Sequence, residues 1–159
     1  MLGRRQLLIA VPMLALMAGC EPLDVAEGKT PAPSDEVRTL QDAFASEQNL
    51  IDLYAKTMAA YSGLSSSLAP LLAQHREHLS RLRGTVSYPP GAKPAPSSSR
   101  HVAVGSGTAS AVRALRSAES AAAAAGLGRL PTVSAANAQL LASIATCETL
   151  HVGTLEGLS

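Results

Sequence analysis

The chain has 159 residues, of which 47% are hydrophobic, 16% charged and 3% aromatic, and its formal net charge is +1. This length corresponds to one ordinary domain, and the apolar fraction is high enough to form a core, which excludes wholesale disorder. Balanced charge and scarce aromatic rings exclude the usual surfaces for nucleic acids, and two cysteines exclude a disulfide framework. Abundant Ala and Leu predict helices rather than a β-sandwich.

The first 19 residues have the features of an export signal. Arg4 and Arg5 precede an apolar run over residues 7–17, which is too short to cross a bilayer because about 20 residues are needed. The following residues, Leu16-Met17-Ala18-Gly19-Cys20, resemble the lipobox of bacterial lipoproteins. The resemblance implies cleavage before Cys20 and diacylation of its thiol, which would anchor the domain to membrane lipid outside the cytoplasm. An ordinary secretory signal with an incidental cysteine is the alternative.

The export route stays open, because the paired arginines loosely resemble a twin-arginine signal as well as a general secretory one. Cleavage would change the net charge from +1 to −1, since Arg4 and Arg5 leave with the signal. Residues 20–33 are rich in Pro, Gly and charge, which predicts a flexible tether. Only Cys147 then remains as a free thiol, and we interpret it as a small buried side chain.

The remaining residues, 34–159, are predicted to form four helices. The first begins after an N-cap at Ser34 and ends near residue 60, and the second covers about 66–83 and stops at Gly84. Residues 84–107 are rich in Pro and Ser and predict a long crossover. The third helix begins near Thr108, and the fourth extends from about Ser134 to the C-terminus. An all-α, ferritin-like four-helix bundle of two hairpins is the predicted fold.

Each predicted helix has ionisable residues in the middle of its apolar stripe. The stripes follow the three-and-four spacing of bundle helices. Their members are Leu40, Phe44, Glu47, Ile51 and Tyr54; Leu68, Leu71, His75, His78 and Leu82; Val112, Leu115, Glu119 and Ala122; and Leu141, Ile144, Glu148, His151 and Leu155. Buried charges are normally paired, neutralised or bound to metal, so these positions predict a polar or metal-binding core.

The six ionisable positions also repeat along the chain. Glu47 and Glu119 are 72 residues apart, and both His75 and Glu148 and His78 and His151 are 73 residues apart. This spacing indicates a diverged duplication of one helical hairpin. It would bring all six side chains to one level of the bundle.

The same residues largely match the ligand pattern of di-iron and di-manganese bundles. That pattern has one Glu on each of two helices and a Glu-x-x-His pair on each of the others. Glu148 and His151 form such a pair, and Glu47 and Glu119 match the single carboxylates, whereas His75 stands where a carboxylate is expected. Iron or manganese is predicted ahead of zinc, with one ion, two ions or none as the open alternatives.

Three stretches of the chain resemble a family of ferritin-like proteins from actinobacteria whose function is unknown. These are residues 45–54 (ASEQNLIDLY), 68–79 (LAPLLAQHREHL) and 140–151 (LLASIATCETLH). The resemblance covers about residues 35–157 and implies a ferritin-like bundle. It implies no activity, so the function has to be argued from the site.

One predicted ligand conflicts with the predicted turns. A turn at Gly126 would leave Glu119 about 14 Å from the level of Glu148 along the bundle, at 1.5 Å per residue. The repeat offers a solution, because it predicts that the third helix continues to about Leu130. If it does not, Glu119 is not a ligand.

Other polar residues are predicted to lie outside the centre. We expect His101 to be solvated in the crossover and Glu77 to lie on an exposed face with Arg81. Tyr54 and Tyr61 are expected to pack in the core with satisfied hydroxyls, with a hydrogen bond to a ligand residue as the alternative.

Two functions are left open by the sequence. The first is a membrane-anchored protein that stores, oxidises or senses iron or manganese. The second is a metal-free bundle that acts as an interaction or scaffold module at the cell envelope, with another envelope protein or a second copy of the chain as candidate partner. No phosphate-binding loop, dinucleotide fingerprint, nucleophile elbow or CxxC motif is present, so whether the chain is an enzyme stays undecided.

Overall fold

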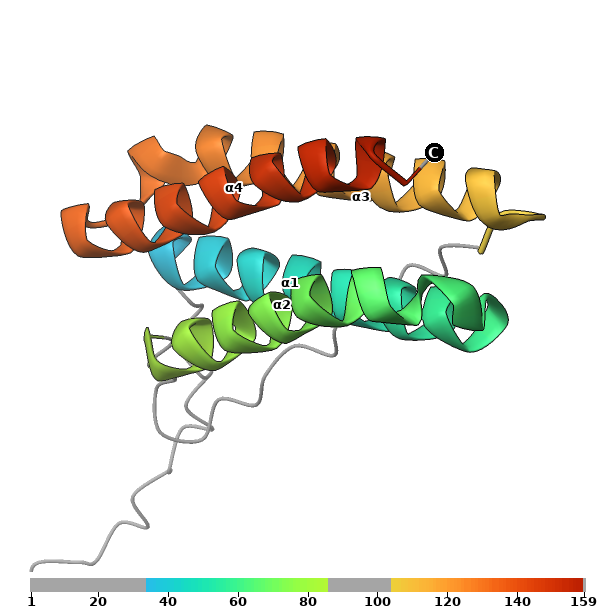
Figure 1. Cartoon of the computed structure of the whole chain (residues 1–159). Coiled ribbons are helices and arrows are strands. Elements are labelled where there is room, and N and C mark those ends of the chain that lie inside the picture. The colour runs from blue at the N-terminus through green and yellow to red at the C-terminus, as the bar shows by residue number, and fades with distance from the viewer. Residues whose placement is uncertain (1–33, 86–103, 159) are drawn as a thin grey trace, which may run out of the picture.

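The protein is an all-α four-helix bundle, as predicted. The computed structural model describes residues 34–85 and 104–158, which contain no strand. The helices are α1 (Asp35–Ala60), α2 (Ser65–Thr85), α3 (Thr108–Arg129) and α4 (Ala135–Glu156) (Figure 1). The predicted signal peptide, Cys20, the tether, and residues 86–103 of the crossover with His101 lie outside the described residues. Within the described ranges, no helix combines the length and apolar character needed to cross a membrane.

The helices form two antiparallel hairpins that pack on each other as two layers (Figure 1). Short 3-10 turns join α1 to α2 at Ser62–Leu64 and α3 to α4 at Leu130–Thr132. The C-terminal end of α2 and the start of α3 lie at opposite ends of the bundle (Figure 1).

Hydrogen bonds join the two hairpins at both ends of the bundle. Tyr61, at the end of α1, donates its hydroxyl to the Gly105 carbonyl at 2.6 Å and accepts the Gly107 N–H at 2.6 Å. At the other end, Glu36 in the first turn of α1 accepts the N–H of Ser134 at 2.9 Å. These contacts fix how far one hairpin can slide along the other.

Local sequence explains where α1 begins, and α2 departs slightly from its predicted bounds. The Ser34 hydroxyl accepts the Val37 N–H at 3.3 Å, which satisfies one of the free donors at the start of α1. The second helix begins before Pro70 and continues one residue past the predicted stop at Gly84. These departures are small and leave the faces of α2 as predicted.

The third helix does not stop at its glycines. It passes through Gly126 and Gly128 and ends at Arg129, as the repeat predicted. A Cβ at Gly126 would lie only 3.3 Å from the Ala145 Cβ, so the glycine permits close packing of α3 on α4. Small residues at this contact also explain the low aromatic content of the chain.

The apolar core consists of two clusters with a polar layer between them. One cluster, toward the α1–α2 turn, contains Leu53, Tyr54, Leu64, Leu68, Leu71, Leu72, Val112, Leu115 and Leu155. The other, toward the α3–α4 turn, contains Leu40, Ala43, Leu82, Leu141 and Ile144. On α1, α2 and α4 the predicted ionisable residues come between members of the two clusters, so this layer is enclosed by leucines at both ends.

Candidate metal centre

All four helices contribute ionisable side chains to the layer between the two apolar clusters. Five of the six predicted residues are buried, and the sixth, His78, has a side chain that is 12% exposed. The buried five are Glu47, His75, Glu119, Glu148 and His151. Burial of so many polar groups requires that they compensate one another or bind a cation.

Glu119 reaches the level of the other residues because α3 continues to Arg129. Its carboxylate contacts side chains of the other three helices, which a turn at Gly126 would have prevented. Glu119 therefore remains a candidate ligand, because the third helix continues past Gly126 as this role required.

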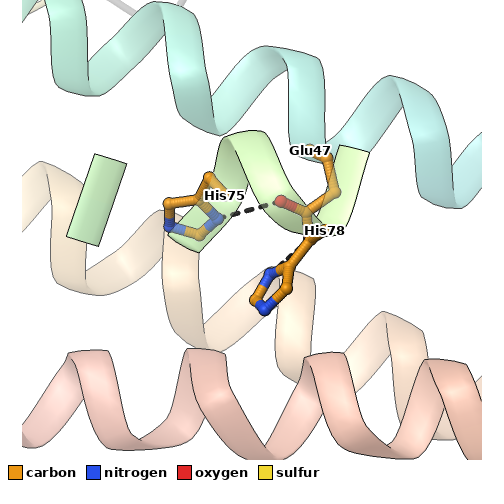
Figure 2. Close-up of side chains that lie close together, drawn as sticks. All are labelled: Glu47, His75 and His78. Atoms are coloured by element: carbon orange, nitrogen blue, oxygen red, sulfur yellow. Dashed lines mark hydrogen bonds and ion pairs between the residues drawn. The ribbon is translucent and has the colours of Figure 1, made fainter. Parts of the chain in front are cut away.

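His75 lies at the middle of the layer and is completely buried. Its Nδ1 is 2.9 Å from Oε2 of Glu47, and its Nε2 is 2.8 Å from Oε1 of Glu119. Figure 2 shows the first of these contacts, and shows His78 on the other side of the Glu47 carboxylate. Burial opposes protonation of the ring, but hydrogen bonds to Glu119 and Glu47 outweigh it and raise the pKa of His75 to about 9. Without metal, the ring is an imidazolium between two carboxylates.

Glu119 is the most heavily hydrogen-bonded carboxylate of the layer. Its Oε1 accepts the Tyr54 hydroxyl at 2.5 Å and also lies 3.2 Å from Nδ1 of His151. Burial alone would raise the pKa of Glu119, but hydrogen bonds with His151 and His75 lower it to about 2. Tyr54 therefore belongs to the site: its hydroxyl is satisfied by a hydrogen bond to Glu119, which is itself a candidate ligand.

Glu148 is buried with 2% exposure, but its environment is the opposite of that of Glu119. Burial and the negative charges of Glu47 and Glu119 raise the pKa of its carboxyl to about 9. In the metal-free protein Glu148 is consequently neutral at pH 7. A nearby cation would favour its ionised form.

Several polar atoms of the layer have no hydrogen-bond partner although they are buried. They include Oε1 of Glu47, Nδ1 of His78 and Oε2 of Glu119. The first two lie 3.4 Å apart and form an ion pair when His78 is protonated (Figure 2), so of these three atoms Oε2 of Glu119 is the one without a polar contact. A buried polar atom without a partner costs about 1–3 kcal/mol, and a cation bound between such atoms would remove this cost.

The ligand atoms form two groups with the spacing of metal sites. One group contains Glu47, His75 and His78, and the other contains His75, Glu119 and His151. Within each group the ligand atoms lie within 4.8 Å of one another. These buried Glu and His groups could hold a metal ion, and their nitrogen and oxygen donors fit a first-row transition metal. Glu148 belongs to neither group, although it lies beside both.

No family model, curated protein or solved structure matches the chain. What the centre does must therefore be inferred from its own residues.

Two residues of the centre were not predicted from the sequence. Gln74 Oε1 accepts a hydrogen bond from Nε2 of His151 at 2.8 Å and from the Cys147 thiol at 2.9 Å. By accepting from Nε2, Gln74 orients the ring of His151 so that Nδ1 is directed at Glu119. Metal-binding histidines commonly have such a partner for the other ring nitrogen.

Cys147 is half-buried beside the centre, rather than buried in an apolar environment as expected. Its sulfur lies 3.5 Å from Nε2 of His151. Gln74, His78 and Cys147 line a pocket of about 100 Å³ between α2 and α4. The pocket gives the partly exposed His78 contact with solvent. Glu77, which also lines it, pairs with Arg81 at 2.6 Å on the exposed face, as predicted.

Proposed function

We propose that the chain is an exported, lipid-anchored ferritin-like protein that binds one or two transition-metal ions in the core of its bundle. The observation that carries the metal proposal is the pair of buried ligand groups that share His75. The unpartnered Oε2 of Glu119 and the orientation of the His151 ring by Gln74 support it. Iron or manganese is the proposed ion, with zinc as a competitor.

The ferritin-like assignment is part of the proposal. It is supported by the order of the ligands along four helices, with single carboxylates on α1 and α3 and paired ligands three residues apart on α2 and α4. The lipid anchor rests on the lipobox-like sequence around Cys20 alone.

Metal analysis after separate reconstitution with Fe²⁺ under anaerobic conditions, Mn²⁺ and Zn²⁺ tests the proposal. We expect at least one ion per chain in the parent protein and loss of most of it in a Glu47→Gln, Glu119→Gln double variant. Glu77→Gln is the matched control, because Glu77 is an exposed carboxylate between two candidate ligands in sequence. A parent protein without stoichiometric metal would contradict the proposal.

The anchor is tested separately. We expect mass spectrometry of the membrane fraction to find a diacylated Cys20 as the first residue. Cys20→Ala should release the domain from the membrane or block its processing. Unmodified Cys20 on an intact N-terminus would refute the anchor and leave the metal proposal unaffected.

A metal-free scaffold module is the second candidate, because the layer can balance most of its charge without metal. The His75 imidazolium lies between two carboxylates, and Glu148 is neutral. This function requires that the parent protein fold and stay soluble with chelator while it binds no metal in the experiment above.

A further inference from the structure

We propose that the centre holds two metal ions at once and that the imidazole ring of His75 bridges them as a shared ligand. This inference rests on the proposed metal-binding function and specifies how that centre is built. It concerns the position at which His75 stands in place of the carboxylate expected in a ferritin-like pattern.

The two nitrogens of His75 belong to different ligand groups. Nδ1 faces Glu47 at 2.9 Å, and Nε2, on the other side of the ring, faces Glu119 at 2.8 Å. One ion cannot bind both nitrogens of an imidazole, because their lone pairs point away from each other. A single ion would therefore leave one of the two carboxylates that face His75 without a cation.

The two groups have equivalent compositions. In one, Oε1 of Glu47 is 3.4 Å from Nδ1 of His78, and in the other, Oε1 of Glu119 is 3.2 Å from Nδ1 of His151. The repeat relates these pairs to each other. With one nitrogen of His75, each group supplies a carboxylate and two imidazole nitrogens, which leaves open coordination positions on both ions.

The charge of the layer also favours a bridged pair. When both ions bind, the two ring protons of His75 and the carboxyl proton of Glu148 leave to solvent. Two nitrogen–metal bonds replace the N–H bonds of His75, and the ring becomes an imidazolate. No electron is transferred. Two divalent cations are then neutralised by the imidazolate and by the carboxylates of Glu47, Glu119 and Glu148, whereas a neutral His75 would leave one positive charge uncompensated in a buried site. The bridge thus accounts for Glu148, which lies in neither ligand group.

Copper loading of the full-length protein tests the bridge. Cu²⁺ is the probe because it binds mixed nitrogen and oxygen sites more tightly than the other first-row divalent ions. Imidazolate couples two Cu²⁺ spins antiferromagnetically. We therefore expect two coppers per chain by elemental analysis and loss of most of the low-temperature EPR signal.

Three variants make the result specific. His78→Ala removes a terminal ligand from one group, so we expect one copper per chain and an EPR signal equal to the copper content. In His75→Gln the copper that still binds should give its full signal. Glu77→Gln should behave like the parent protein. Circular dichroism of each variant checks that it is folded, and His78→Ala keeps the test valid if His75→Gln unfolds.

The separation of the ions gives an independent measurement. Anomalous diffraction from the copper-loaded protein should locate two ions about 6 Å apart, because each metal–nitrogen bond is about 2 Å long. Ions bridged by carboxylate or oxygen in two-metal sites lie roughly 3.5–4 Å apart. A single copper in the parent protein, two coppers with a full EPR signal, or a separation near 4 Å would each overturn the bridge while leaving metal binding intact. Absence of bound copper, iron, manganese and zinc would overturn the proposed function as well.

Discussion

The metal-free protein should lose stability as the pH rises above 6.5, because two buried groups hold protons that the unfolded chain releases. His75 has its pKa raised from 6.5 to about 9, since hydrogen bonds to Glu119 and Glu47 outweigh the effect of burial. Its stabilising contribution is fully present below pH 6.5 and is lost as the pH rises through 9. The carboxyl of Glu148, whose pKa burial and neighbouring charges raise from 4.5 to about 9, acts in the same direction, and its contribution is lost over the wider range from pH 4.5 to 9.

The magnitude follows from the shift of His75. Each pKa unit corresponds to about 1.4 kcal/mol, so this ring alone lowers the free energy of unfolding by about 3 kcal/mol between pH 6.5 and 9. At roughly 2–4 °C per kcal/mol for a domain of about 150 residues, the melting temperature should fall by about 6–12 °C. On the acid side, Glu119 acts with the opposite sign, because its lowered pKa means that stability is lost as the pH falls from 4.5 toward 2.

Urea unfolding in the presence of chelator, monitored by circular dichroism from pH 5 to 9.5, measures this effect. Glu148→Gln is the matched variant: it keeps the size of the side chain but cannot ionise, so its pH dependence should shrink to the part due to His75. A free energy of unfolding that stays constant or rises between pH 6.5 and 9 would refute the assignment of a protonated His75 in the metal-free protein.

Three further predictions concern single contacts. Tyr54→Phe removes the hydroxyl that donates to Glu119 and should lower the free energy of unfolding of the metal-free protein by about 1.5–3 kcal/mol, measured by urea unfolding; an unchanged midpoint would mean that the hydrogen bond has no net value. Gln74→Leu should weaken metal binding about 10–100-fold in a competition titration, because the His151 ring loses the acceptor that orients it, whereas Gln74→Glu retains the acceptor; equal affinities for the parent and the Leu variant would exclude this positioning role. Gly126→Val should destabilise the protein by about 1–3 kcal/mol because α4 is in contact there. Gly128→Ala, where a Cβ meets open space, should stabilise it by about 0.5–1 kcal/mol; equal effects at the two glycines would contradict the close packing of α3 on α4.

The arrangement of the helices was predictable because it follows from spacing along the sequence. Apolar residues at intervals of three and four mark the buried face of a helix, and this fixed which side of α2 carries His75 and His78. The continuation of α3 through Gly126 could not be settled from α3 alone, since glycine is compatible with both a turn and a close helix contact. It was the 72-residue spacing of Glu47 and Glu119 that favoured the longer helix.

The contacts inside the layer could not be predicted in the same way. Gln74 is on the solvent-exposed side of α2, and its interaction with His151 depends on how α2 and α4 face each other and on the side-chain rotamers. The position of Cys147 at the edge of the centre could not be predicted either, because its thiol contacts Gln74 only through the packing of α4 against α2. Periodicity indicates which face is buried, but it contains no information on which nitrogen of a ring meets which carboxylate.

The leucine clusters on both sides of the polar layer have a consequence for how the helices align. If α2 slid along its neighbours by one turn, about 5.4 Å, the His75 ring would lose both carboxylates and lie against leucines. The shifted arrangement would bury an uncompensated charge, so it is strongly disfavoured relative to the native one. An all-leucine seam would tolerate the same slip at small cost. The six ionisable residues therefore select one register between the two hairpins, whether or not an ion is bound.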